Sequence, residues 1–455
     1  MSVHPSGTRW YNSVWRWHFY AGLFCIPFVI WLALTGSIYL WRPQIEAWLD
    51  RPYQHLALSG PAATPDAQVA AALAAVPGSR LHKYVLPQAP DSAVNILVTR
   101  GGADKRVYLN PVTLKVLDVV SEEKRPMRVI FHLHGELLAG AWGSYLVEIA
   151  ACWTIVMLLT GMYLWWPRGY RGLAGVLYPR LRRGKRVLWR DIHAVAGIWV
   201  TGAAVGLVLT GLPWAKAWGS YLTEIREVTG ATGGPVNWSI GGKTPKADPM
   251  LGDHEGHPMA GMTMNGAVSM TPIRPGELAR VIATVRPLDV APPVLIAPSA
   301  VEGAPWSITS DAADRPLRSD LKIDGMTGRV TDRVDFAERH WIDRLVGYGI
   351  ALHEGAFFGI ANQLLGTLTA LLLVVLALSG TVLWWRRRPI GLLGAPIPLT
   401  RPRFGGVLIA AVVALGLYLP MFGVTLIAML AVERLVLRRI APVRTWLALR
   451  PVESR

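Results

Sequence analysis

Two histidines, His18 and His193, open two long apolar segments of the chain in the same way. Each is followed four residues later by a glycine, Gly22 or Gly197, and each segment closes with the tripeptide Leu-Thr-Gly. An ionisable side chain inside a membrane is costly, so a histidine there is a candidate functional residue. Imidazole is a common axial ligand of haem iron. A glycine one turn away lies on the same helix face, where a missing side chain would let a flat macrocycle approach the backbone.

A second pair, His134 and His353, begins two further apolar segments. At the same distances after each histidine stand a glycine, then a threonine or serine followed by glycine (a hydroxyl-glycine pair), and then two adjacent tryptophans. These positions are Gly140 and Gly359, Thr160-Gly161 and Ser379-Gly380, and Trp165-Trp166 and Trp384-Trp385. His132 lies two residues before His134 and therefore on another helix face, and the repeat places Ala351 where His132 would map. We therefore predict two bis-histidine haem sites, His18 with His193 and His134 with His353.

A simpler interpretation of these histidines is that they are structural. Small residues line helix interfaces in membranes, so one histidine beside one glycine is typical of helix packing. The same His-x-x-x-Gly spacing in both halves of the chain favours ligation over packing.

The composition is that of a membrane protein, with 52% hydrophobic and 17% charged residues. Four apolar runs have about the 20 residues that cross a bilayer. They lie near 19–41, 145–166, 194–214 and 364–385. A fifth hydrophobic stretch, 404–437, contains Pro420 and predicts either one kinked span or a short hairpin. The first run is too long for a signal peptide and lacks a small-residue cleavage site, so we expect an uncleaved helix.

The net charge of +16 is concentrated beside the apolar runs rather than in a nucleic-acid-binding patch. The loop 167–190 is rich in arginine and has no acidic residue, and the next short loop begins with three arginines at 386–388. By the positive-inside rule these loops and the N-terminus are cytoplasmic, and segments 42–130 and 215–345 lie outside. We expect lipid contacts and no nucleic-acid partner.

The chain repeats one unit twice: an outgoing helix, an external segment and a returning helix. The external segments, near 55–125 and 270–337, each combine a short helix with alternating strand patterns. The expected fold is therefore a membrane all-α helical bundle of four main transmembrane helices plus a C-terminal hydrophobic segment, with two small α+β external modules.

A Gly-, Pro- and Met-rich stretch, 230–271, is expected to form a poorly ordered loop. Imidazole and thioether side chains cluster within it, and such ligands suit copper or transiently bound iron. The candidate loop ligands are His254, His257, Met259, Met262 and Met264. The alternative is a polar loop that binds no metal.

Several short motifs recur in order along most of the chain. They are Trp17-His18 with Gly22, the segments 107–111 and 321–328, Leu133-His134-Gly135, Leu352-His353-Glu354, and the tryptophan pairs before the basic loops. With these motifs the chain resembles the PepSY-associated transmembrane family. The resemblance implies an inner-membrane protein of bacteria with two periplasmic PepSY-like modules, and some members are similar to di-haem reductases that release iron from ferric siderophores. The first module has Thr113-Leu114 where a Thr-Gly turn is usual.

The resemblance and the topology together give one expected organisation. In residue numbers it is the N-terminus and first span (1–41), periplasmic module 1 (42–130), second span (131–166), basic loop (167–190), third span (191–214), periplasmic region with the His/Met-rich loop and module 2 (215–345), fourth span (346–385), basic loop (386–403), hydrophobic segment (404–437) and basic tail (438–455).

We expect a haem-containing reductase that passes electrons from a quinol or cytoplasmic donor to a periplasmic ferric siderophore or other metal chelate. Two b-type haems are expected, because the Cys-x-x-Cys-His attachment motif is absent. A helix from His18 to Trp41 would rise about 35 Å, so haems at its two ends would face opposite sides of the membrane. The alternatives are a copper-handling reductase or transfer protein that uses the His/Met loop, and a non-redox protein whose PepSY-like modules bind a partner.

Overall fold

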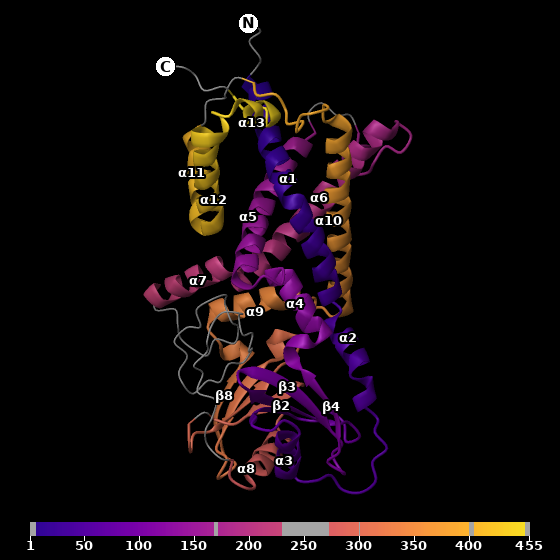
Figure 1. Cartoon of the computed structure of the whole chain (residues 1–455), viewed down its shortest axis with the longest axis vertical. Helices are drawn as coiled ribbons and strands as arrows, with labels where there is room; N and C mark the ends of the chain where they lie inside the picture. Colours follow the sequence, from indigo (N-terminus) through magenta and orange to yellow (C-terminus); the bar gives the residue numbers. More distant parts are fainter. Residues whose placement is uncertain (1–5, 168–171, 230–272, 300, 400–404, 451–455) are drawn as a thin grey trace. The chain divides into compact units, whose positions relative to one another are not determined.

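The computed structural model describes residues 6–167, 172–229, 273–299, 301–399 and 405–450. The chain forms two compact units (Figure 1). The helical unit contains Met1–Ser37, His134–Tyr221 and Leu364–Arg455, and the sheet unit contains Ile38–Leu133 and Leu222–Gln363.

Four long helices run side by side in the helical unit (Figure 1). They are α1 (Ser6–Tyr39), α5 (Gly140–Trp165), α6 (Lys185–Gly211) and α10 (Ile360–Arg387). Cys25 of α1 is fully buried in a cluster with Met157 of α5 and Ala377 of α10, and Val200 of α6 packs in a second cluster with Leu376. These four helices and Pro420–Leu437 are, among the described residues, the five long and apolar enough to cross a membrane. The predicted multi-pass membrane bundle is confirmed at this level.

The C-terminal hydrophobic stretch forms a hairpin rather than one kinked helix. Helix α11 (Gly406–Tyr418) is followed by α12 (Pro420–Val432), which continues through a π-helical turn, η6 (Glu433–Leu437). A Cβ atom on Gly423 would lie 2.9 Å from the carbonyl oxygen of Gly416, so the two helices touch where both residues lack side chains. Leu419 at the turn is fully buried against α5.

The returning segments are each broken into two helices. Residues 131–166, expected as one span, contain the end of α4 (Pro126–Glu136) and all of α5, and α9 (Trp341–His353) likewise ends before α10 begins. Gly140 and Gly359 have φ angles of +55° and +57° at these breaks. Glycine adopts this left-handed conformation without steric cost, which explains why the repeat places it there.

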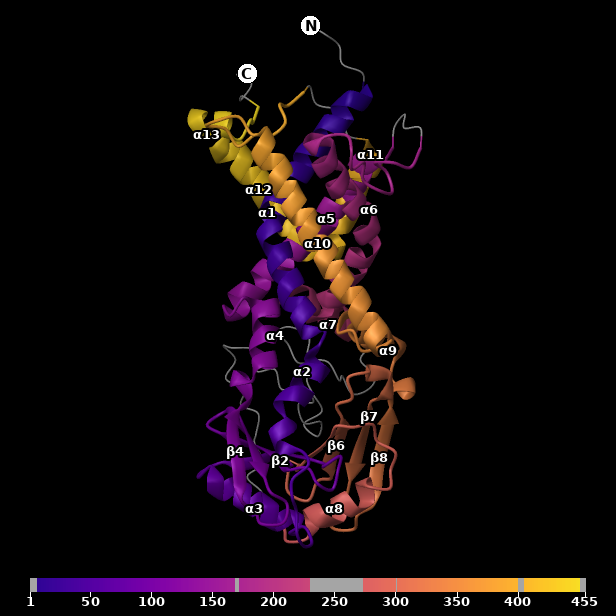
Figure 2. The same ribbon diagram turned by 90° about the vertical axis from the view of Figure 1, so that its right-hand side faces the viewer.

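The sheet unit is built on one antiparallel sheet of eight strands in the order β4-β3-β2-β1-β5-β6-β7-β8 (Figure 2). The strands are β1 (Arg80–Val85), β2 (Val94–Arg100), β3 (Ala103–Leu109), β4 (Val116–Ser121), β5 (Val294–Ala297), β6 (Trp306–Ser310), β7 (Ser319–Ile323) and β8 (Val330–Asp335). The two expected modules therefore share a sheet, in which Tyr84 of β1 pairs with Ile296 of β5. This pairing removes one exposed edge from each half.

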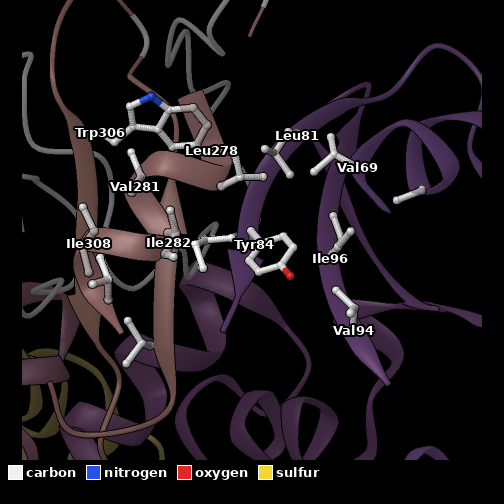
Figure 3. Close-up of a cluster of buried hydrophobic side chains, with 14 of the residues drawn as sticks. Val69, Leu81, Tyr84, Val94, Ile96, Leu278, Val281, Ile282, Trp306 and Ile308 are labelled. Carbon is white, nitrogen blue, oxygen red and sulfur yellow. The ribbon is translucent and has the colours of Figure 1, made fainter. Parts of the chain in front are cut away.

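Helices α3 (Pro65–Ala75) and α8 (Glu277–Val285) bury one face of this sheet. Figure 3 shows side chains of both halves, such as Ile96, Ile282 and Ile308, pointing into the same hydrophobic cluster. The remaining helical elements connect the strands and spans. They are α2 (Arg42–Leu49), α7 (Lys216–Thr229), α13 (Ala441–Trp446) and the short turns η1 (Arg51–Tyr53), η2 (Glu122–Lys124), η3 (Leu212–Trp214), η4 (Arg315–Leu317) and η5 (Phe336–Glu338).

The unusual Thr113-Leu114 turn keeps the geometry of its counterpart in the other half. The Asn110 side chain accepts hydrogen bonds from the amides of residues 112 and 113, and Asp324 accepts the matching pair from residues 326 and 327. Leu114 has φ +59° where Gly328 has φ +75°. The same turn therefore forms with leucine in a conformation that favours glycine.

The ion pair between Arg106 and Glu122 predicts an acid-sensitive contribution to stability. Two N–O distances of 2.9 Å join the side chains, and both are mostly buried. Burial alone would raise the pKa of Glu122, but the charge and hydrogen bonds of Arg106 lower it below its ordinary value. The pair therefore stabilises the fold above pH about 4.3, the unfolded pKa, and this stabilisation is lost as the pH falls through the lower, folded pKa.

We expect Glu122→Gln to lower the free energy of unfolding by about 1–3 kcal/mol at pH 7. The difference from wild type should shrink as the pH falls below about 4. Thermal unfolding of both proteins over a pH series measures this. Glu302→Gln is the matched control, because the Glu302 pair with Arg274 is exposed and 3.5 Å long. A Glu122→Gln effect that stays constant with pH would contradict the assignment.

Candidate functional site

His18 of α1 and His193 of α6 face each other inside the helical unit. Their ring centres are 6.3 Å apart and their ring planes are inclined by 76°. Both side chains are half-buried. The structure thus brings together the two residues whose matching positions in the repeat suggested a ligand pair.

The Nδ1 atom of each ring is held by a neighbouring helix. His18 Nδ1 lies 3.0 Å from the Met157 carbonyl oxygen and 3.1 Å from Thr160 Oγ1, both on α5. His193 Nδ1 lies 3.0 Å from the Leu376 carbonyl oxygen and 3.2 Å from Ser379 Oγ, both on α10. A carbonyl oxygen only accepts, so Nδ1 carries the proton in each ring and Nε2 keeps its lone pair. Histidine ligands of metals are oriented by such contacts.

The spacing of the two rings fits two ligands on one metal. An imidazole nitrogen binds a first-row metal at about 2.0 Å and lies about 1.1 Å from its own ring centre, so two imidazoles on opposite sides of one metal have ring centres about 6.2 Å apart. The part of the chain that the structure describes has no group of three or more His, Cys, Asp or Glu side chains that could hold a metal ion. Haem fits a two-histidine donor set, because the porphyrin supplies the other four nitrogen ligands.

Gly22 packs against α5 and Gly197 packs against α10, the helices that hydrogen-bond to His18 and His193. A Cβ atom on Gly22 would be 3.8 Å from Met157 Sδ, and one on Gly197 would be 3.6 Å from Leu376 Cδ1. Both distances are ordinary van der Waals contacts. The structure therefore gives each glycine a packing contact with the helix that anchors its histidine.

The other two predicted ligands occupy equivalent places in the chain, each in the last turn of a short helix. His134 is two residues from the end of α4, and His353 is the last residue of α9. His134 belongs to the helical unit, where its Nδ1 atom lies 3.0 Å from Thr35 Oγ1 of α1. His353 belongs to the sheet unit and is half-buried. Their pairing remains a prediction from the sequence repeat.

Two further candidates have other roles in the structure. His132 Nε2 lies 2.9 Å from a carboxylate oxygen of Glu123, so this histidine is hydrogen-bonded to that side chain. Glu148, buried in α5, accepts hydrogen bonds of 2.8 and 3.0 Å from the amides of Ala217 and Trp218. It therefore caps the first turn of α7, where the helix dipole favours a negative group.

The end of the helical unit next to His18 gathers the chain's basic loops. Arg16 donates to the carbonyl oxygens of Pro396 and, at 3.0 Å, Ala448. Asp191, which precedes His193 by two residues and is fully buried, binds Arg180 at 2.7 Å and Arg190 at 2.8 Å. These contacts join the loops to α1 and α6, the helices that carry the two histidines.

The hydroxyl groups of Thr160 and Ser379 are site groups that the sequence did not predict. The repeat does mark these two residues, because Thr160 lies 26 residues after His134 and Ser379 lies 26 residues after His353. The histidines that they contact, His18 and His193, lie on other helices, so the spacing does not reveal the contacts.

The candidate loop ligands His254, His257, Met259, Met262 and Met264 lie outside the described residues.

A family model described as the PepSY-associated TM region matches residues 15–387. The match includes all four predicted ligand histidines and confirms the family resemblance seen in the motifs. A search of curated proteins finds no match to the chain.

Proposed function

We propose that this chain, which belongs to the PepSY-associated TM family, binds haem and carries electrons across a bacterial inner membrane to a ferric chelate. The observation that carries the proposal is the pair His18 and His193, with ring centres 6.3 Å apart and both Nδ1 atoms held by neighbouring helices. This arrangement leaves two Nε2 lone pairs as ligands for one metal.

A haem held by His18 and His193 would supply one-electron transfer, because the two imidazoles would leave no iron position open for a substrate. The protein contributes the two ligands, their fixed orientation and a surrounding bundle that limits water access. Oxidation of one quinol would release two electrons and two protons, so two ferric chelates would be reduced per quinol.

The sequence repeat supports a second haem between His134 and His353, on the side of the membrane opposite to the basic loops. The span Trp10–Tyr39 has 30 residues, or about 45 Å of helix, which exceeds the roughly 30 Å hydrocarbon core. Two haems near the ends of such helices would face opposite sides of the membrane. In this proposal the sheet unit is periplasmic, its two halves are PepSY-like modules, and a ferric siderophore receives the electrons there.

A reduced-minus-oxidised visible spectrum of the detergent-purified protein, with haem measured per chain, tests the proposal. We expect two b-type haems per chain, and rapid reoxidation of the reduced protein by a ferric siderophore. Protein purified from haem-replete cells with no haem would refute the proposal. One haem per chain would keep the His18–His193 site and refute the second.

A further inference from the structure

Three hydroxyl-glycine pairs contact three of the four proposed ligands, and we call them the anchoring pairs. They are Thr160-Gly161 at His18, Ser379-Gly380 at His193 and Thr35-Gly36 at His134. We infer that the anchoring pairs are positioning residues that hold each imidazole ring and select Nε2 as its metal-binding nitrogen. This inference rests on the proposed function, and it assigns a role to dipeptides on helices other than those that carry the ligands.

The hydroxyl group of each pair can only accept a hydrogen bond from its histidine, because its own proton is used within its helix. Thr160 Oγ1 donates to the Val156 carbonyl oxygen at 2.7 Å. Ser379 Oγ donates to the Leu376 carbonyl oxygen at 3.0 Å, and Thr35 Oγ1 donates to the Trp31 carbonyl oxygen at 2.8 Å. A lone pair of each oxygen therefore faces Nδ1, and Nδ1 must carry the proton.

The glycine of each pair makes room for the ring. A Cβ atom on Gly161 would lie 3.2 Å from Cε1 of His18, and one on Gly380 would lie 3.2 Å from Cε1 of His193. On Gly36 the corresponding distance to His134 is 3.0 Å. These distances are shorter than ordinary van der Waals contact, so any side chain there would push the imidazole away.

The agreement among the three pairs argues against a packing role alone. The Nδ1–hydroxyl distances are 3.0, 3.1 and 3.2 Å, and the same Cε1 atom faces each glycine. Helix packing in membranes requires small residues, but it does not require a hydroxyl lone pair directed at Nδ1. Thr381, next to Gly380, donates to its own helix at 2.9 Å, and among the described residues it has no such contact with a histidine.

A hydrogen bond accepted from Nδ1 makes Nε2 a more basic ligand. A more basic ligand stabilises ferric iron more than ferrous iron, so loss of the hydroxyl should raise the reduction potential. A tenfold change in the ratio of the two affinities corresponds to about 59 mV for a one-electron couple.

The first test compares Thr160→Val with Thr160→Ser and with the control Thr381→Val. We expect the potential of one haem to rise in Thr160→Val by up to about 59 mV, to remain at the wild-type value in Thr160→Ser, and not to change in Thr381→Val. A purely structural role would not give this pattern. Equal potentials in Thr160→Val and Thr381→Val would overturn the inference.

The second test compares Gly161→Ala with Gly202→Ala, which is also helical but has no atom within 4 Å of an added Cβ. We expect about 10- to 100-fold weaker binding of one haem in Gly161→Ala and wild-type binding in the control. Unchanged haem binding in Gly161→Ala would overturn the steric part of the inference.

Histidine nitrogen-15 spectra of protein prepared without haem separate this inference from the proposed function. The anchoring pairs predict a neutral Nδ1–H tautomer for His18, with an Nδ1–H proton shift that changes in Thr160→Val and not in Thr381→Val. If wild type binds no haem but this pattern is found, the proposed function fails and the positioning role stands. An Nε2–H tautomer at His18 would overturn the positioning role whatever the haem content.

Discussion

His193→Ala is expected to contain one haem per chain, against the two proposed for wild type, and to reduce an external ferric chelate at least 100-fold more slowly. Loss of an outer contact to a metal ligand costs about 10- to 100-fold in affinity or activity, and loss of the ligand itself should cost more. We propose that His193 Nε2 shares a metal with His18, whose ring centre lies 6.3 Å from its own. Haem extraction and the rate of ferrous iron formation measure both effects.

His18→Ala should give the same result, and the double variant should be no worse than either single variant. Residues that act as one unit have non-additive effects, and both histidines are proposed to hold the same haem. His132→Ala is the matched control, because this half-buried histidine is bound to Glu123 instead. Two haems per chain in His193→Ala, with wild-type spectra, would remove His193 from the ligand set.

The pairing of His18 with His193 could be predicted from sequence because helix geometry is regular. Equal spacing from each histidine to the end of its apolar run places both at the same height on equivalent helices. The repeat in the sequence is therefore enough to predict that the two histidines lie at the same level of the bundle. Among the described residues, the five helices that are long and apolar enough to cross a membrane follow from length and composition in the same way.

Contacts that depend on distant parts of the chain could not be predicted. Thr160 lies 142 residues from His18, and no local pattern says which helix faces which. The pairing of β1 with β5 joins strands about 200 residues apart, and alternation within a strand specifies its buried face but not its neighbour. The breaks before α5 and α10 depend on a few residues with positive φ angles. Two of those before α5, Leu137 at +52° and Leu138 at +56°, are not glycines and give no signal of a break in the sequence.

Asp343→Ala is expected to cause the largest loss of stability in the sheet unit. Asp343 of α9 binds Arg226 of α7 through two contacts, of 2.9 and 3.1 Å, and their side chains are 3% and 5% exposed. Removal of one partner of a buried ion pair costs about 3–5 kcal/mol, because the remaining charge stays out of water. Thermal or denaturant unfolding of the detergent-solubilised protein measures this loss.

Two further variants decide whether the charge itself is responsible. Replacing both partners, as Arg226→Leu with Asp343→Leu, should recover most of the lost stability, since apolar pairs of similar volume often replace buried ion pairs without cost. Arg333→Ala is the exposed control, because the pair of Arg333 with Asp335 is 39% and 44% exposed and such pairs contribute about 0–1 kcal/mol. If the double variant were as unstable as Asp343→Ala, the packing of α7 against α9, rather than an uncompensated buried guanidinium, would explain the loss.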